Sequence, residues 1–103
     1  MSKVIPAKIS KKERNQLKKL LCKKVAKLKN ESQVINFLSD LLTESEFIMI
    51  IRRLEIAKML LDEKTYYEIK TALNVSPQTI QTVREKLNKS LGGYLNFIKH
   101  LKV

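Results

Sequence analysis

Apolar residues recur at helical spacing along most of this chain, and the pattern is clearest between residues 65 and 87. Thr65 and Glu68 stand three apart, which is the signature of a capping box at a helix start. Ile69 and Leu73 then fall on one face of that helix. Asn74 follows, and Asn tolerates the left-handed conformation that a sharp helix exit needs. The pattern predicts a short helix that ends in a tight turn.

A second short helix is predicted directly after this turn. Ser76 is a strong N-cap residue, and Pro77 is favoured at the first helical position. Ile80, Val83 and Leu87 recur at spacings of three and four and give the helix one apolar face. Two short helices joined by a tight turn, with their apolar positions in register, are typical of a helix-turn-helix. The alternative is a helical hairpin that packs and binds nothing.

The rest of the chain also reads as helical. We expect helices over residues 10–29, 34–42, 44–62 and 94–101, with further capping boxes at Ser10 with Glu13 and at Thr43 with Glu46. Residues 1–9 have no helical period and are predicted to be a flexible basic arm. The fold class is therefore predicted to be all-α, with a single domain over residues 10–103. Its helix-turn-helix, called the reader below, covers residues 65–89.

The run from Phe47 to Ile51 is apolar at every position, inside the predicted helix 44–62. A helix that is apolar all round must be covered on every side. A chain of 103 residues has few helices to do this. The simplest prediction is a homodimer in which a second copy supplies the missing wall. The alternative is a central helix surrounded by its own neighbours.

The charge of this chain is unevenly distributed. The formal net charge is +11, and residues 1–30 hold 11 Lys and Arg against one acid, Glu13. Like charges at i, i+4, such as Lys23 and Lys27, repel one another. Such a helix indicates an anionic partner, and DNA or RNA phosphate fits best. The apolar face of this helix lacks aromatic residues, so we expect no membrane partner.

Catalytic and metal-binding patterns are missing from the sequence. His100 and Cys22 are the only residues of their types, so no Cys/His pair or cluster of metal ligands is at hand. There is no glycine-rich phosphate loop. We expect no enzyme activity, no cofactor, and a packed structural role for Cys22. A single cysteine, no secretory signal and no long apolar run predict a cytoplasmic protein.

The polar side of the second short helix is the candidate for base recognition, because its N-terminal part meets the bases in a helix-turn-helix. Gln78 and Gln81 are the best candidates, since a Gln amide pairs bidentately with adenine. Pro77 and Thr82 offer apolar contacts to a thymine methyl group. Candidates to hold phosphates are Arg52, Thr65, Tyr67, Lys70, Arg84 and Lys86. The alternative for each is a solvated surface side chain.

Part of this chain resembles a known protein family. Residues 42–87 are similar to the Trp repressor superfamily, and most of all to its Trp-repressor-related YerC/YecD branch. The features that carry it are Leu42-Thr43, the run Arg53–Leu60, Thr65-Tyr66, Glu68-Ile69, Thr79-Ile80 and Gly92-Gly93-Tyr94. The resemblance implies an interlaced, all-α homodimer with two helix-turn-helix heads. It also implies transcriptional repression at a palindromic double-stranded DNA operator.

The same resemblance allows a prediction about tryptophan binding. The Trp repressor holds its indole between two arginines, and Arg53 matches the one on the long helix. The other falls at Thr82, which cannot stack on an indole. We therefore expect no tryptophan binding. Two further functions stay open at this point: a helical protein-interaction module, and an RNA-binding accessory factor with a basic tethering arm.

Overall fold

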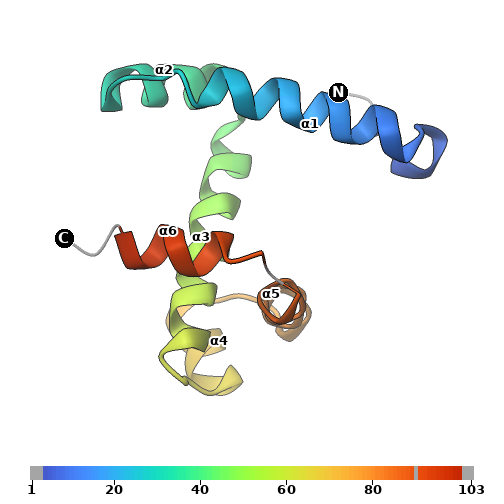
Figure 1. The fold of residues 1–103 in the computed structure, drawn as a ribbon. Coiled ribbons are helices and arrows are strands. Elements are labelled where there is room, and N and C mark those ends of the chain that lie inside the picture. The colour runs from blue at the N-terminus through green and yellow to red at the C-terminus, as the bar shows by residue number, and fades with distance from the viewer. Residues whose placement is uncertain (1–3, 90, 101–103) are drawn as a thin grey trace. The chain divides into compact units, whose positions relative to one another are not determined.

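The chain folds into helices throughout the part that the structure describes (Figure 1). The structure is a computed structural model, and it describes residues 4–89 and 91–100. Its elements are a short 3-10 helix η1 (Pro6–Lys8) and the α-helices α1 (Lys11–Val25), α2 (Glu31–Leu41), α3 (Glu44–Leu61), α4 (Tyr66–Leu73), α5 (Pro77–Asn88) and α6 (Gly93–His100). The all-α prediction is confirmed.

The helices group into two compact units, residues 1–41 and residues 42–103. The first contains η1, α1 and α2, and the second contains α3 to α6. The predicted boundary between a flexible arm and a single domain at residue 10 is not tested by this grouping and stays a prediction. The arm was expected to lack helical structure, yet Pro6–Lys8 form one 3-10 turn.

Helix α1 begins where the sequence predicts and ends earlier. Ser10 Oγ accepts a hydrogen bond from Glu13 N (3.1 Å), which is the N-cap half of the expected capping box. The helix was expected to reach residue 29 and instead ends at Val25. Ala26 N still bonds four residues back, to Cys22 O, but Lys27 N bonds three residues back, to Lys24 O at 3.1 Å, so the chain leaves the helix through a narrower turn.

Helix α2 begins three residues before the predicted start at Val34, because Asn30 caps it. Asn30 Oδ1 accepts from Gln33 N at 2.9 Å, and Gln33 Oε1 accepts from Lys29 N at 2.8 Å. The first bond satisfies one of the amides that a helix start leaves without a partner, and the second ties Lys29 N to the first turn of α2. The helix therefore covers Glu31–Leu41.

Neither α1 nor α2 contains a buried residue. Leu17, Leu20 and Leu21 are each about half exposed, although they form the apolar stripe of α1. Cys22 is exposed as well, so the packed position expected for it was wrong. Apolar stripes that stay open to water are surfaces for further burial.

The core of the second unit lies where α3, α4 and α5 meet. The buried residues of this core are Ile56, Ala57, Ile69, Leu73, Ile80 and Val83. Thr43 starts α3 with a full capping box: Glu46 N donates to Thr43 Oγ1 (3.1 Å), and Thr43 N donates to Glu46 Oε1 (2.9 Å). Helix α4 lies at the C-terminal end of α3, and α5 lies beside α3 (Figure 1).

Helix α6 closes the second unit and contacts α3 (Figure 1). Tyr94 and Ile98 pack against the core, as the amphipathic pattern of this segment predicts. Gly92, at φ +92°, adopts a backbone conformation that side-chain-bearing residues rarely take, and α6 starts directly after it. The predicted end of this helix, Leu101, lies outside the described residues.

The N-terminal half of α3 differs from its C-terminal half. Ile56 and Ala57 are fully buried, whereas Ile48 and Met49 are 53% and 52% exposed. Ile50 and Ile51 are exposed as well. Helices α4, α5 and α6 of the second unit thus leave Ile48–Ile51 exposed, while Phe47 is half-buried. Among the described helices, none has both the length and the hydropathy needed to cross a membrane.

Candidate nucleic-acid interface

Helices α4 and α5 form the two-helix reader that the sequence predicts. Thr65 starts α4 with a capping box, in which Glu68 N donates to Thr65 Oγ1 (3.1 Å) and Thr65 N donates to Glu68 Oε1 (3.0 Å). Asn74 ends α4 at φ 53° and ψ 48°, the left-handed conformation expected of it, and donates its N–H to Lys70 O (2.8 Å). The chain then turns and enters α5.

Helix α5 is fixed to α4 at its start and along its apolar face. Ser76 Oγ accepts from Thr79 N (3.2 Å), and Pro77 occupies the first turn of the helix. Ile80 and Val83 are buried against the α4 side chains of the same core. Burial on this face leaves the opposite face of α5 toward solvent, since successive residues turn by about 100°.

Three of the four predicted base-reading residues lie exposed near the start of α5. Pro77, Gln78 and Thr82 are exposed. Thr82 Oγ1 donates to Gln78 O at 3.0 Å, so its hydroxyl proton is used within the helix and its methyl group remains for an apolar contact. Each sits where the sequence reasoning expected it, although base contact itself stays a prediction.

Gln81, the fourth, is placed differently. Its side chain is half-buried, and Tyr66 Oη donates to Gln81 Oε1 at 2.6 Å. On the other side, Gln81 Nε2 donates to Glu85 Oε1 at 3.4 Å. The expectation of a free, outward amide is therefore not met in this structure, because Tyr66 and Glu85 occupy both of its ends.

Arg84 belongs to the same hydrogen-bonded group as Gln81 and Tyr66. Its Nε donates to Tyr66 Oη at 2.8 Å, and its guanidinium lies over the Tyr66 ring, 5.1 Å from the ring centroid. Sequence reasoning missed Tyr66 and Glu85 as members of this group. Helical periodicity places Gln81 off the apolar face of α5, and no spacing rule links it to a residue fifteen positions earlier.

The remaining predicted phosphate contacts are spread over α3, α4 and α5. Tyr67 is 77% exposed, and Lys70 and Lys86 are exposed. Arg52 Nη1 pairs with Glu55 Oε1 at 3.0 Å on the exposed side of α3. Thr65 uses its hydroxyl as the cap of α4. Of the predicted phosphate contacts, Lys70 and Lys86 are the cationic side chains that make no hydrogen bond or ion pair within the described residues.

The two capping boxes also set the charge state of their glutamates. The backbone N–H of Thr65, followed by its side-chain hydroxyl, lowers the pKa of Glu68 from its ordinary value. Thr43 lowers the pKa of Glu46 in the same way, again mainly through its backbone N–H. The ionised form of each glutamate is thus favoured at the positive end of its helix, α4 for Glu68 and α3 for Glu46.

Arg53, the residue matched to a tryptophan-binding arginine, borders a pocket of about 380 Å³. Gln78, Thr82 and Lys86 of α5 line the same pocket, together with Met49, Thr79, Val83 and Tyr94. The structure thus brings Arg53 beside two predicted base readers and one predicted phosphate contact. Thr82, which the resemblance matches to the second indole-holding arginine, supplies a hydroxyl and a methyl group rather than a guanidinium.

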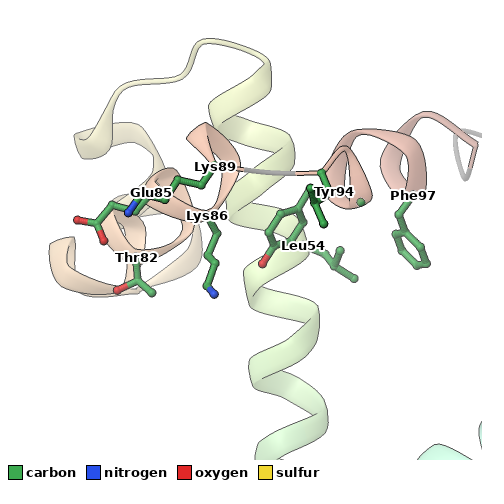
Figure 2. Close-up of a pocket in the computed structure, with 9 residues that line it drawn as sticks. Leu54, Thr82, Glu85, Lys86, Lys89, Tyr94 and Phe97 are labelled. Atoms are coloured by element: carbon green, nitrogen blue, oxygen red, sulfur yellow. The ribbon is translucent and has the colours of Figure 1, made fainter. Parts of the chain in front are cut away.

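A larger open pocket of about 700 Å³ lies alongside, between α3, α5 and α6. Figure 2 shows Lys86 of α5 and Tyr94 of α6 extending toward the same space beside Leu54 of α3. Leu91 and Phe97, which also line it, are exposed apolar residues. Among the described residues, no group of three or more potential metal ligands comes together.

The sequence of this chain is similar to those of known proteins. The family model described as Trp repressor protein matches residues 15–102. The chain belongs to the Trp repressor family. It is also 34% identical over 70 residues to the uncharacterized protein YerC of Bacillus subtilis (strain 168), covering 68% of this chain and 67% of that protein. The resemblance to the Trp-repressor-related YerC branch is confirmed.

Membership of the Trp repressor family indicates the class of function. This family is one of regulatory proteins rather than enzymes, and it indicates a helical DNA-binding regulator. The match extends upstream of residues 42–87 into α1. It therefore includes most of the basic helix, which lies outside the segment whose motifs carry the resemblance.

Proposed function

We propose that this protein is a sequence-specific double-stranded DNA-binding transcriptional regulator that acts as a repressor, as a homodimer. The observation that carries the proposal is the α4–α5 reader, whose left-handed turn at Asn74 and Ser76 cap hold an exposed polar face at the start of α5. Pro77, Gln78 and Thr82 lie on this face. In a helix-turn-helix this part of the second helix enters the major groove.

The dimer is supported by apolar surface that the chain does not cover itself. Ile48, Met49, Ile50 and Ile51 of α3 are 40–53% exposed, and the apolar stripes of α1 and α2 are open as well. A folded chain in water rarely leaves so many large apolar side chains exposed without a partner. A second copy offers complementary stripes, and two-fold symmetry would duplicate the reader.

Phosphate binding would draw on α1 as well as on the reader. At about 100° per residue, Lys12, Lys19 and Lys23 fall on the side of α1 opposite to Leu17 and Leu21. All three lysines are exposed. Their charges supply sequence-independent attraction to phosphates, while α5 supplies base contacts.

The proposal is tested by selecting bound duplexes from a random double-stranded DNA library. We expect enrichment of a palindromic site with half-site centres about one helical turn apart, roughly 10 base pairs. Enrichment of no duplex, under conditions where the protein is folded, would contradict the proposal. Single-stranded RNA run in parallel tests the RNA-binding alternative, which predicts retention of RNA and no duplex preference.

A further inference from the structure

Four side chains link α4 to α5 in a chain of hydrogen bonds that runs from a cation to an anion. Arg84 Nε donates to Tyr66 Oη (2.8 Å), Tyr66 Oη donates to Gln81 Oε1 (2.6 Å), and Gln81 Nε2 donates to Glu85 Oε1 (3.4 Å). We call this group the Tyr66 chain. Each of these donors meets an acceptor, so the direction of the chain is set by the charges at its two ends.

The direction of the Tyr66 chain decides which way the Gln81 amide faces. A guanidinium can only donate, so the Tyr66 hydroxyl accepts from Arg84 and has one proton left to donate. That proton is satisfied when the amide oxygen of Gln81, rather than its NH₂ group, faces Tyr66, as it does in this structure. A carboxylate can only accept, and Glu85 therefore favours the NH₂ group on the opposite side. Both ends of the Tyr66 chain therefore favour the same orientation of the Gln81 amide.

This orientation restricts what Gln81 can offer to a base. Bidentate pairing with adenine needs the amide oxygen to accept from N6 while the NH₂ group donates to N7. The oxygen of Gln81 is turned toward Tyr66 on a half-buried side chain, and one amide proton is directed at Glu85. One N–H of Gln81 remains as a donor. A single N–H donor can pair with a base edge that presents an acceptor. It disfavours cytosine, whose major-groove group is itself a donor.

We propose that Tyr66 is a positioning residue that determines specificity by holding Gln81 as a single donor. The inference rests on the proposed function, because it concerns how this reader recognises bases. Tyr66 itself reaches no base in this role. Its part is to remove adenine pairing from Gln81, leaving that pairing to Gln78, whose amide makes no hydrogen bond within the part of the chain that the structure describes.

The direct test is base selection by Tyr66→Phe beside the wild type. The substitution keeps the ring that packs against the core and removes only the hydroxyl, so the Gln81 amide is free to swing outward. The base pair read by Gln81 is identified as the one where Gln81→Ala loses its preference. At that base pair we expect the wild type to reject cytosine without an adenine preference, and Tyr66→Phe to gain an adenine preference of about tenfold.

Tyr94→Phe is the matched control. Tyr94 is a tyrosine of α6 that packs against the same core and takes no part in the Tyr66 chain. We expect its base frequencies at this position to equal those of the wild type. Equal base frequencies for Tyr66→Phe and the wild type, in the presence of a clear Gln81→Ala effect, would overturn the inference. A Gln81-dependent adenine preference of tenfold or more in the wild type would overturn it as well.

A readout without DNA separates failure of this inference from failure of the proposed function. The side-chain amide of Gln81 can be followed by ¹⁵N nuclear magnetic resonance and assigned by its loss in Gln81→Ala. We expect Tyr66→Phe to shift this resonance and speed its proton exchange, and Tyr94→Phe to leave it unchanged. An unshifted resonance in Tyr66→Phe would overturn the inference even if duplex DNA is bound. If the wild type selects no duplex, the proposed function fails and the specificity role fails with it.

Discussion

Individual residues of the reader differ in how free they are to recognise a base. Gln78 and Gln81 are three positions apart on α5 and look equivalent in the sequence. Within the residues that the structure describes, Gln78 is exposed and its amide makes no hydrogen bond, whereas Gln81 is half-buried between Tyr66 and Glu85. The free amide is therefore the stronger candidate for bidentate pairing with adenine.

Replacing Gln78 should consequently cost affinity at the selected site alone. We expect Gln78→Ala to lose roughly 1–3 kcal/mol of binding free energy at that site and almost nothing on random duplex. Asn88→Ala, which removes an exposed amide at the far end of α5, is the control and should change neither. Fluorescence anisotropy with both duplexes measures this. An equal loss on the two duplexes would mean that Gln78 does not read a base.

The ligand expectation also depends on single residues. Arg53 borders a pocket of about 380 Å³ that Thr82 also lines. The resemblance to the Trp repressor matches Thr82 to the second arginine that holds the indole. We expect calorimetry to show no stoichiometric tryptophan binding in the micromolar range, and Thr82→Arg to bind tryptophan more tightly than the wild type. Micromolar, stoichiometric binding by the wild type would contradict this expectation.

Whole elements were predictable where a local residue pattern decides them. The starts of α3, α4 and α5 follow from Thr43, Thr65 and Ser76, because cap hydrogen bonds span only three residues. The end of α1 was not predictable, since its apolar spacing continues to Leu28 although the helix ends at Val25. The Gln81 orientation was not predictable either, because it depends on contact between α4 and α5.

The capping boxes of α3 and α4 should make stability fall in acid. The folded-state pKa of Glu46 and of Glu68 is lowered, so their ionised forms stabilise the fold above the unfolded pKa, and this contribution is lost as the pH falls. We expect the free energy of unfolding of the wild type to drop more steeply below about pH 4.3 than that of Glu46→Gln with Glu68→Gln. Urea unfolding across pH measures this.

A control for this effect is Glu63→Gln, which removes a carboxylate outside both capping boxes. Its stability curve should run parallel to that of the wild type. Parallel curves for the wild type and the double variant would show that the cap hydrogen bonds do not depend on charge.

Helix α1 should govern the salt dependence of DNA binding. We expect Lys19→Gln with Lys23→Gln to weaken binding to every duplex, and to reduce the slope of log affinity against log salt by about 0.9 for each phosphate that the variant no longer neutralises. Lys58→Gln with Lys99→Gln removes the same charge from the second unit and serves as the control. Binding titrations at several salt concentrations give both slopes. Identical slope changes in the two variants would mean that net charge alone acts.

At the scale of the whole molecule, the charge and the reader reside in different parts of the chain. Residues 1–30 hold 11 of the 21 basic residues, while the reader lies in residues 65–89. One copy leaves the N-terminal half of α3 and the stripes of α1 and α2 open to water. Pairing of two copies would cover these surfaces and present two copies of α5, which is what a palindromic site requires.

The mass of the protein–DNA complex tests this central claim most directly. Sedimentation equilibrium of the protein with its selected duplex should show two chains on each duplex, and the protein alone should sediment as a dimer. One chain on each duplex, or a monomer at the concentrations where binding is measured, would contradict the claim.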